Sequence, residues 1–243
     1  MHATKQLAFP LRNRSRWGGQ RPGAGRKPGA HPGLAHRSRP RFPGRYPAHV
    51  TLKIRPDVPS LRTVRLVREI ERSFSAACER GQFRVVHYSL QSDHAHLLVE
   101  AANRHALGRG MKAIGARLAR AVNRVFQRRG PVLADRFHLH VLRTPREVRA
   151  ALAYVLLNAR RHARRVVGAL RVDPASSARW FDGWRRDRRA PAEARCGDAA
   201  SGAEAQRGDT ASSPVARART WLLGRGWRCH GLLDPSAVPG PRR

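Results

Sequence analysis

The stretch that most constrains this chain is Ser92–Glu100, with the sequence Ser-Asp-His-Ala-His-Leu-Leu-Val-Glu. Side chains in a β-strand alternate between the two faces of the sheet, so His94 and His96 share one face while the apolar residues around them enter a core on the other. Two imidazoles about 7 Å apart along a strand can converge on one metal ion and leave room for a third ligand. A His-x-His pair alone is weak evidence, so this interpretation depends on a second element downstream.

That second element is the segment Tyr154-Val155-Leu156-Leu157-Asn158, which is predicted to lie in a helix. Tyr154 and Asn158 are four residues apart and stand on the same helix face. The apolar stripe of this helix lies on a different face and comprises Val148, Leu152, Leu156 and Ala159. The amide oxygen of Asn158 is a suitable third metal ligand beside two imidazoles, and Tyr154 would then lie within reach of whatever the metal holds.

The charge of the chain narrows the class of partner. Lys and Arg number 49 against 16 Asp and Glu, which gives a formal charge of +33. A charge of this size excludes an ordinary enzyme of a small neutral metabolite and indicates a polyanionic partner, namely nucleic acid. The basic residues are nearly all arginine, whose planar fork binds phosphate bidentately and stacks on bases.

The cysteines and the apolar runs indicate the compartment. Cys78, Cys196 and Cys229 are widely scattered and form no CxxC pair, as expected in a reducing cytosol. No apolar run is long enough for a signal peptide or a transmembrane helix. We therefore expect a soluble cytoplasmic protein that associates with the nucleoid and has no membrane partner.

Composition divides the chain into three parts. Residues 1–46 are rich in Arg, Gly and Pro and predict a basic disordered tail, in which Arg26 and Lys27 either follow a phosphate backbone or stay solvated. Residues 47–170 carry regular apolar patterns and predict the folded catalytic domain. Residues 171–243 predict a C-terminal extension.

The C-terminal extension is predicted to contain both a loose linker and packed segments. A loose linker is expected around residues 188–214, which are rich in Ala, Gly, Ser and Arg. Trp180–Trp184 is predicted to be a short packed segment, and Trp221–Leu223 together with Trp227 is predicted to dock back onto the catalytic domain.

Apolar periodicity in the central part predicts the element order β-α-β-β-α-β followed by one more helix. Strands are expected from His49, from Phe83 to Leu90, at His94 and from Phe137 to Val141. Helices are expected from Val64 to a stop at Gly81, from Leu107 to Arg128 and after Thr144. The apolar stripe of the first of these helices is expected to comprise Val64, Val67, Ile70, Phe74 and Ala77. The element order indicates an α+β fold with the ferredoxin-like split arrangement, strand order 4-1-3-2, in which the strand of His94 is interior. Thr144 is the expected N-cap of the additional C-terminal helix, which carries Tyr154.

A divalent ion held by His94, His96 and Asn158 suits phosphoryl transfer on DNA. Tyr154 would attack a scissile phosphate through its phenolate, form a covalent 5′-phosphotyrosine and release a 3′-hydroxyl. The covalent link conserves the phosphodiester energy, so strands can be rejoined without ATP. A phenol with a reference pKa of about 10 requires nearby metal or arginine charge to ionise.

These motifs resemble those of the HUH single-tyrosine transposases, and most closely the REP-associated tyrosine transposases, over roughly residues 47–162. The resemblance rests on Asp93–Val99, on Tyr154–Asn158 and on the basic glycine-rich N-terminus. It implies a DNA transposase, a metal-dependent endonuclease and strand transferase that cuts single-stranded DNA at hairpins such as repetitive palindromic elements. It also implies Mg²⁺ or Mn²⁺ as the cofactor, with a monomer or homodimer as the assembly. Ala95 is small for the hydrophobic slot of the motif, and Ala159 stands where many members have Pro, but neither departure removes a reacting group.

Further residues are candidate DNA contacts. The polar face of the helix from Leu107 carries Lys112, Arg117, Arg120 and Arg124. His138 and His140 share a face of the fourth strand, which lies one strand away from the strand of His94. They are therefore too far to join the same ion and are expected to serve structure or DNA contact. His49 and His87 are expected to be structural.

Two other functions fit the same sequence. A non-catalytic DNA- or RNA-binding protein could use this fold, although the predicted sheet lacks the closely spaced aromatic residues of an RNA-stacking surface. A replication-initiator or relaxase relative would share the histidine pair and Tyr154. Such proteins usually carry a larger catalytic domain with further histidine ligands.

Overall fold

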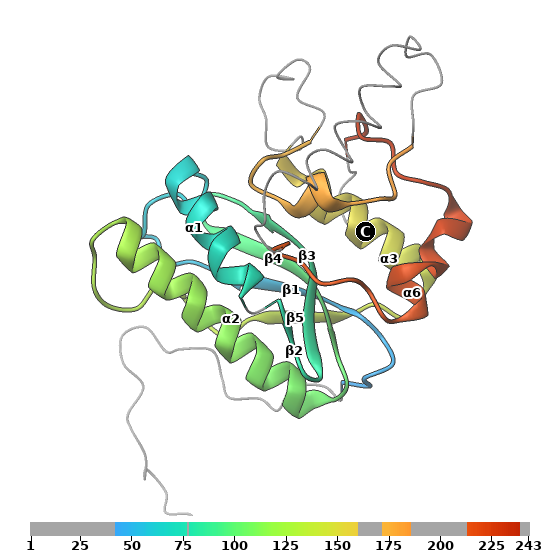
Figure 1. The fold of residues 1–243 in the computed structure, drawn as a ribbon, viewed down its shortest axis with the longest axis horizontal. Coiled ribbons are helices and arrows are strands. Elements are labelled where there is room, and N and C mark those ends of the chain that lie inside the picture. The colour runs from blue at the N-terminus through green and yellow to red at the C-terminus, as the bar shows by residue number, and fades with distance from the viewer. Residues whose placement is uncertain (1–41, 77, 160–171, 186–212, 239–243) are drawn as a thin grey trace, which may run out of the picture. The chain divides into compact units, whose positions relative to one another are not determined.

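An antiparallel five-stranded sheet with the order β2-β3-β4-β1-β5 forms the centre of the fold (Figure 1). The strands are β1 (Ala48–Lys53), β2 (Glu79–Arg80), β3 (Phe83–Leu90), β4 (His94–Ala101) and β5 (His138–Val141). Apart from the two-residue β2 at one edge, this is the strand order 4-1-3-2 predicted from the sequence. The prediction that the strand of His94 is interior is confirmed, because β4 pairs with β1 on one side and β3 on the other.

The computed structural model describes residues 42–76, 78–159, 172–185 and 213–238, all of which belong to one unit, Ser38–Arg243. Arg26 and Lys27 of the predicted basic tail, and nearly all of the predicted linker around residues 188–214, lie outside the described residues. Among the helices of these described ranges, none is both long and apolar enough to cross a bilayer.

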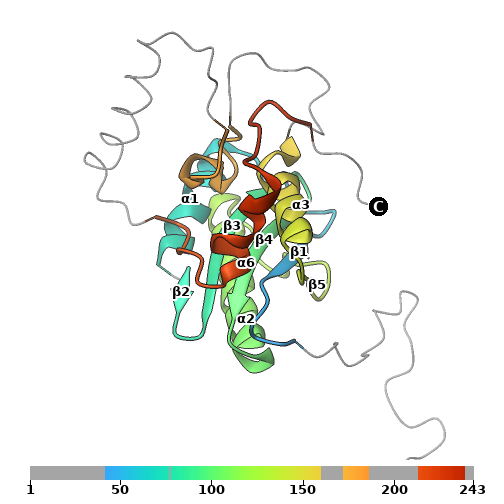
Figure 2. The same ribbon diagram turned by 90° about the vertical axis from the view of Figure 1, so that its right-hand side faces the viewer.

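Helices cover both faces of the sheet (Figures 1 and 2). Helices α1 (Val64–Ser75) and α2 (Arg104–Val125) pack on one face, and α3 (Pro145–Leu156) packs on the other. The alternation along β4 separates the two cores, since Ala95 and Leu97 face α1 and α2 whereas Leu98 faces α3. His94 and His96 therefore lie on the α3 face of the sheet.

Capping residues set where the helices begin. Thr144 accepts a hydrogen bond from the Glu147 N–H at 3.2 Å, with Pro145 in the first turn, so the predicted N-cap of α3 is confirmed. Asn103 caps α2 in the same way through Ala106, at 2.9 Å, and for this reason α2 begins three residues before the predicted start at Leu107.

Two sequence predictions about the first helix are wrong. Val64 was expected to belong to the apolar stripe, but it is 68 % exposed at the start of α1, and Leu66 is buried instead. Gly81 was expected to end the helix, yet α1 ends at Ser75. Gly81 has a φ of +55° and forms the turn between β2 and β3, a hairpin that the sequence pattern did not reveal.

The described parts of the C-terminal extension are packed against the domain and are not loose. They form the short helices η1 (Ser177–Trp180), α6 (Trp221–Gly224) and η2 (Gly226–His230). Leu223 and Trp227 are buried in the same core as α3, and Phe181 stacks on Trp227 with ring centroids 5.5 Å apart. The predicted docking of the tryptophan-containing segments is therefore confirmed, and these segments cover the outer side of α3.

Candidate active site

The two histidines of β4 converge as their spacing predicted. The ring centroids of His94 and His96 lie 4.6 Å apart, and their Nε2 atoms are separated by 3.0 Å. Two nitrogens that each lie about 2.1 Å from an octahedral ion, at right angles to one another, are about 3.0 Å apart. The two imidazoles thus have the spacing that chelation of a single cation requires.

Asp93 orients His94. The Asp93 Oδ1 atom lies 2.7 Å from Nδ1 of His94, and this hydrogen bond is the main cause that lowers the pKa of the Asp93 carboxyl below its ordinary value. A carboxylate accepts the proton of Nδ1, so Nε2 of His94 keeps its lone pair for a ligand. This is the usual arrangement around a histidine that binds a metal.

The other ring nitrogen of His96 contacts β1. Nδ1 of His96 lies 3.1 Å from Nε2 of His49 and 3.2 Å from Oγ1 of Thr51. Strand pairing explains this, because Thr51 is directly opposite His96 and His49 is two residues away on the same face. The sequence predicts only a structural role for His49, whereas the structure places it in the candidate site. Its position follows from the register of β1 against β4, which the sequence pattern does not reveal.

Tyr154 is the tyrosine that lies beside the histidines. Its ring centroid is 5.0 Å from that of His96 and 5.9 Å from that of His49, in edge-on geometry. Tyr88 lies in the core on the opposite face of the sheet, where burial raises the pKa of its phenol and its hydroxyl donates to Glu71 at 3.1 Å. Tyr88 is therefore unsuited to act as a nucleophile.

Asn158 has the burial expected of a ligand, although its local structure differs from the prediction. Helix α3 ends at Leu156, and Asn158 follows a break at Leu157 and not an uninterrupted helix. The Asn158 side chain is fully buried, and neither Oδ1 nor Nδ2 has a hydrogen-bond partner among the described residues.

An unpartnered buried amide costs about 1–3 kcal/mol, and a cation bound by Oδ1 of Asn158 would offset this cost. Among the described residues, no group of three His, Cys, Asp or Glu side chains is placed to hold a metal ion. A donor set of the two imidazoles and the amide oxygen of Asn158 would fit Mg²⁺ or Mn²⁺.

His138 and His140 are exposed on the edge strand β5. They lie directly opposite Thr51 and His49 of β1, so both point to the same face of the sheet as His96. β1 separates them from β4, as predicted, and they extend the histidine face outward to the sheet edge.

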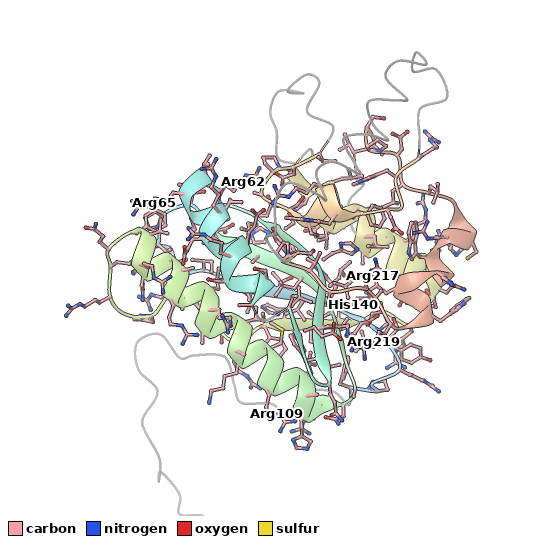
Figure 3. All side chains as sticks on the ribbon, in the orientation of Figure 1. Arg62, Arg65, Arg109, His140, Arg217 and Arg219 are labelled. Carbon is pink, nitrogen blue, oxygen red and sulfur yellow. The ribbon has the colours of Figure 1, made fainter. Side chains whose placement is uncertain are left out.

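The basic residues predicted to bind DNA on α2 lie on the other face of the sheet. Arg117, Arg120 and Arg124 line a groove of about 310 Å³ between α1 and α2. Lys112 is exposed on the same helix. Figure 3 shows arginines on several elements; those labelled are Arg62, Arg65, Arg109, Arg217 and Arg219. The α2 arginines are not adjacent to Tyr154, because α2 and α3 lie on opposite faces of the sheet.

One protein family matches part of this chain. Residues 48–142 match the family described as IS200-like transposases, which confirms the resemblance predicted from the histidine strand over these residues. The matched range contains His49, His94 and His96 but ends before α3, so Tyr154 and Asn158 lie outside it.

Comparison with individual proteins adds one structure. The solved structure of a REP-associated tyrosine transposase bound to a REP hairpin is 14 % identical, with a TM-score of 0.42, over 54 % of this chain and 75 % of that one. No curated protein sequence matches the chain. We rest the functional proposal on the family match and on the geometry of the site.

Proposed function

We propose that this protein is a metal-dependent transposase that cuts and rejoins single-stranded DNA through a covalent link to Tyr154. The observation that carries the proposal is the convergence of His94 and His96, with Nε2 atoms 3.0 Å apart, next to the ring of Tyr154. The match of residues 48–142 to IS200-like transposases supports the same chemistry.

The proposed cleavage is an in-line substitution at phosphorus. The phenolic oxygen of Tyr154 forms a bond to the phosphorus atom, and the bond from phosphorus to the 3′ oxygen of the preceding nucleotide breaks. The phenol proton is lost to water, and the departing 3′ oxygen takes up a proton and becomes a hydroxyl. Attack of a 3′-hydroxyl on the phosphotyrosine reverses these steps and rejoins a strand.

A divalent cation bound at this site would polarise the scissile phosphate and stabilise the charge that develops on its oxygens. His94, His96 and Asn158 would hold that cation, and Asp93 keeps the ring of His94 in the binding orientation. Tyr154 lies on α3, on the same side of the sheet as the two histidines, and its ring centroid is 5.0 Å from that of His96, which supports its role as the nucleophile.

The proposed substrate is a single-stranded DNA hairpin. The formal charge of +33 supports a nucleic-acid partner. We propose that exposed His138 and His140 contact the strand that leads to Tyr154. The arginines of α2, on the opposite face, are proposed to bind the phosphates of a more distant part of the DNA.

A direct test is to incubate the full chain and Mn²⁺ with a labelled library of single-stranded hairpins and to look for a protein–DNA adduct that survives denaturing electrophoresis. Tyr154→Phe removes only the nucleophilic oxygen and should abolish the adduct while leaving hairpin binding nearly intact. The matched control is Tyr46→Phe, which removes the hydroxyl of a half-buried tyrosine whose ring lies under Arg45.

The outcomes separate the candidate functions. Binding without an adduct in the wild-type protein would indicate a non-catalytic nucleic-acid-binding protein. An adduct that persists in Tyr154→Phe would show that another group attacks, and the single-tyrosine chemistry would be withdrawn. Loss of the adduct in Tyr154→Phe alone supports the transposase.

A further inference from the structure

His49 is not part of the His94–His96 motif, and its position does not suit a metal ligand. It is 97 % shielded from solvent on β1, and its Nε2 atom contacts Nδ1 of His96 at 3.1 Å. A third histidine ligand would have to approach the point between the two Nε2 atoms of His94 and His96. Since Nδ1 and Nε2 project from opposite sides of an imidazole, His49 lies on the wrong side of His96 to bind the same ion.

We propose that His49 is a positioning residue that selects the metal-binding tautomer of His96; this inference rests on the proposed function. A neutral imidazole carries one proton, so Nε2 of His96 has a free lone pair only when Nδ1 carries the proton. That proton needs an acceptor, and Nε2 of His49, at hydrogen-bond distance, accepts it when His49 carries its own proton on Nδ1. His49 thereby does for His96 what Asp93 does for His94.

Thr51 alone would not fix the tautomer. Its hydroxyl lies 3.2 Å from Nδ1 of His96, but a hydroxyl can both donate and accept. If Thr51 donated to Nδ1, the proton of His96 would reside on Nε2 and would block the cation. When His49 accepts the hydrogen bond from Nδ1–H of His96, the Thr51 hydroxyl cannot donate to Nδ1. It can then only accept from the same N–H or bond to another group. With its own proton on Nδ1, His49 can only accept at this contact, and it then decides between two tautomers of His96 that Thr51 leaves equal.

The test uses substitutions that separate ring packing from hydrogen bonding. His49→Phe retains a planar ring and removes the acceptor, whereas His49→Gln retains an acceptor at a similar reach. The control is His87→Phe, because His87 is a buried histidine of β3 that bonds to Ser177 of η1. Mn²⁺ affinity is measured on each full chain without DNA, by calorimetry, and folding is checked by near-ultraviolet circular dichroism.

We expect His49→Phe to weaken Mn²⁺ binding by about 10- to 100-fold, the effect typical of a lost partner of a metal-bound histidine. His49→Gln should recover most of this loss, and His87→Phe should bind Mn²⁺ as the wild type does. Undiminished Mn²⁺ affinity in a folded His49→Phe protein would overturn the inference, as would a loss of equal size in His49→Gln.

A second measurement keeps the inference testable if His49→Phe does not fold. The nitrogen chemical shifts of His49 in the wild-type protein with Mg²⁺ distinguish a proton on Nδ1 from one on Nε2. A proton on Nδ1 of His49 is expected, because its Nε2 then accepts from His96, and a proton on Nε2 would overturn the role of His49. Failure of the proposed function would be seen in a different experiment, as an adduct that survives in Tyr154→Phe. That result does not depend on the tautomer of His96.

Discussion

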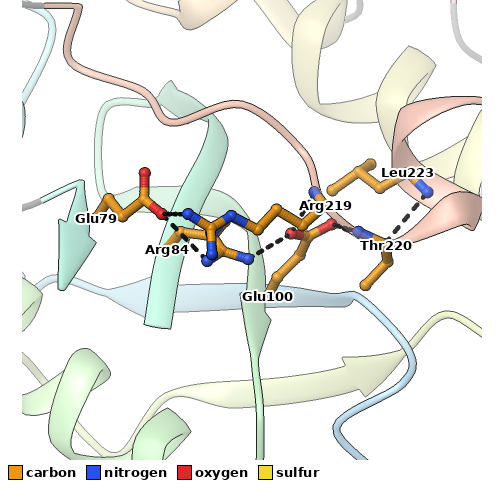
Figure 4. A network of polar contacts seen from close by, with 6 residues as sticks. All are labelled: Glu79, Arg84, Glu100, Arg219, Thr220 and Leu223. Carbon is orange, nitrogen blue, oxygen red and sulfur yellow. Dashed lines mark hydrogen bonds and ion pairs between the residues drawn. The ribbon is translucent and has the colours of Figure 1, made fainter. Parts of the chain in front are cut away.

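The carboxylate of Glu100 accepts two hydrogen bonds from Thr220, from the backbone N–H at 2.9 Å and from the hydroxyl at 2.7 Å (Figure 4). Glu100 is a buried residue of β4, four positions after His96 and on the same face of the sheet. The backbone N–H of Arg219 also donates to this carboxylate, at 2.8 Å. The strand that carries the histidines is thus tied directly to the C-terminal segment.

That segment in turn holds α3. Trp227 is buried against α3, and the Arg149 side chain of α3 donates to the backbone oxygen of Gly231 at 2.9 Å. β4, the C-terminal segment and α3 consequently form a closed set of contacts, with the histidines on one member and Tyr154 on another. The position of Tyr154 depends on residues more than 60 positions later in the chain.

Thr220→Val should therefore loosen α3 without touching the site. The substitution keeps the side-chain shape but removes a hydroxyl that donates to Glu100 and caps Leu223, so the free energy of unfolding should fall by about 1–3 kcal/mol. Urea unfolding followed by tryptophan fluorescence measures this change. Adduct formation should slow while hairpin affinity stays, and Thr220→Ser is the control because it keeps the hydroxyl. Equal behaviour of the two variants would argue against the hydroxyl as an anchor.

Replacing the amide of Asn158 should raise the stability of the metal-free protein and abolish its stabilisation by metal. Its amide is buried and unpartnered among the described residues, so Asn158→Leu replaces it by an apolar side chain of similar size. In metal-free buffer the variant should be more stable by about 1–2 kcal/mol, because the cost of the orphaned amide is removed. Mn²⁺ should no longer raise its melting temperature.

The control for this prediction is Asn158→Asp, which keeps an oxygen ligand and should retain stabilisation by Mn²⁺. A thermal melt with and without Mn²⁺ measures both variants. If Asn158→Leu were destabilised in metal-free buffer and still responded to Mn²⁺ like the wild type, Asn158 would be a packing residue and not a ligand.

The elements that sequence periodicity predicts well are those whose signal is local. The alternation around His94, the N-cap at Thr144 and the apolar spacing in α2 each depend on residues within a few positions of one another. The order of the strands also followed, because few topologies connect these elements without crossing.

Features that depend on long-range register could not be predicted in the same way. His49 enters the site because β1 pairs with β4 in one particular register, and a shift of one residue would point it to the other face. The anchoring of Thr220 on Glu100 joins residues 120 positions apart, and no local pattern records such a contact. Likewise, the break at Leu157 that precedes Asn158 carries neither Gly nor Pro as a signal.

Stability should fall on acidification because of His87. Burial lowers the pKa of His87 to about 4 from its ordinary 6.5, against a smaller opposing effect of Asp182. In the unfolded chain His87 takes up a proton as the pH falls through 6.5, whereas in the folded protein it stays neutral until about pH 4. The unfolded state therefore binds more protons in this window, and the stability present above pH 6.5 is progressively lost toward pH 4.

The loss attributable to His87 is on the order of 3 kcal/mol, since one pKa unit corresponds to about 1.4 kcal/mol. His87→Asn keeps a side chain that can bond to Ser177 but does not titrate, so its stability should vary less with pH than that of the wild type. Urea unfolding at pH 7, 6, 5 and about 4.5 provides the comparison. If the free energy of unfolding fell equally with pH in the wild type and in His87→Asn, other groups would govern acid unfolding. His138→Asn is the control, because His138 is exposed.

The groove between α1 and α2 should contribute to DNA affinity mainly through Arg120. Two of its cations, Arg72 and Arg124, are ion-paired with the buried carboxylate of Glu69. Arg117 donates to the backbone oxygen of Ser73 at 3.3 Å. Arg120 is exposed and has no such partner among the described residues, so it can bind a phosphate without first breaking a contact.

Arg120→Ala should therefore weaken hairpin binding and reduce the slope of log affinity against log salt by about 0.7–0.9, the value for one neutralised phosphate. Adduct formation at saturating DNA should remain, because α2 and Tyr154 lie on opposite faces of the sheet. Arg228→Ala is the matched control, since Arg228 is held by Asp182 at 2.8 Å and stacks on Trp227. Its salt slope should equal that of the wild type, whereas an unchanged slope in Arg120→Ala would remove this groove from the DNA-binding surface.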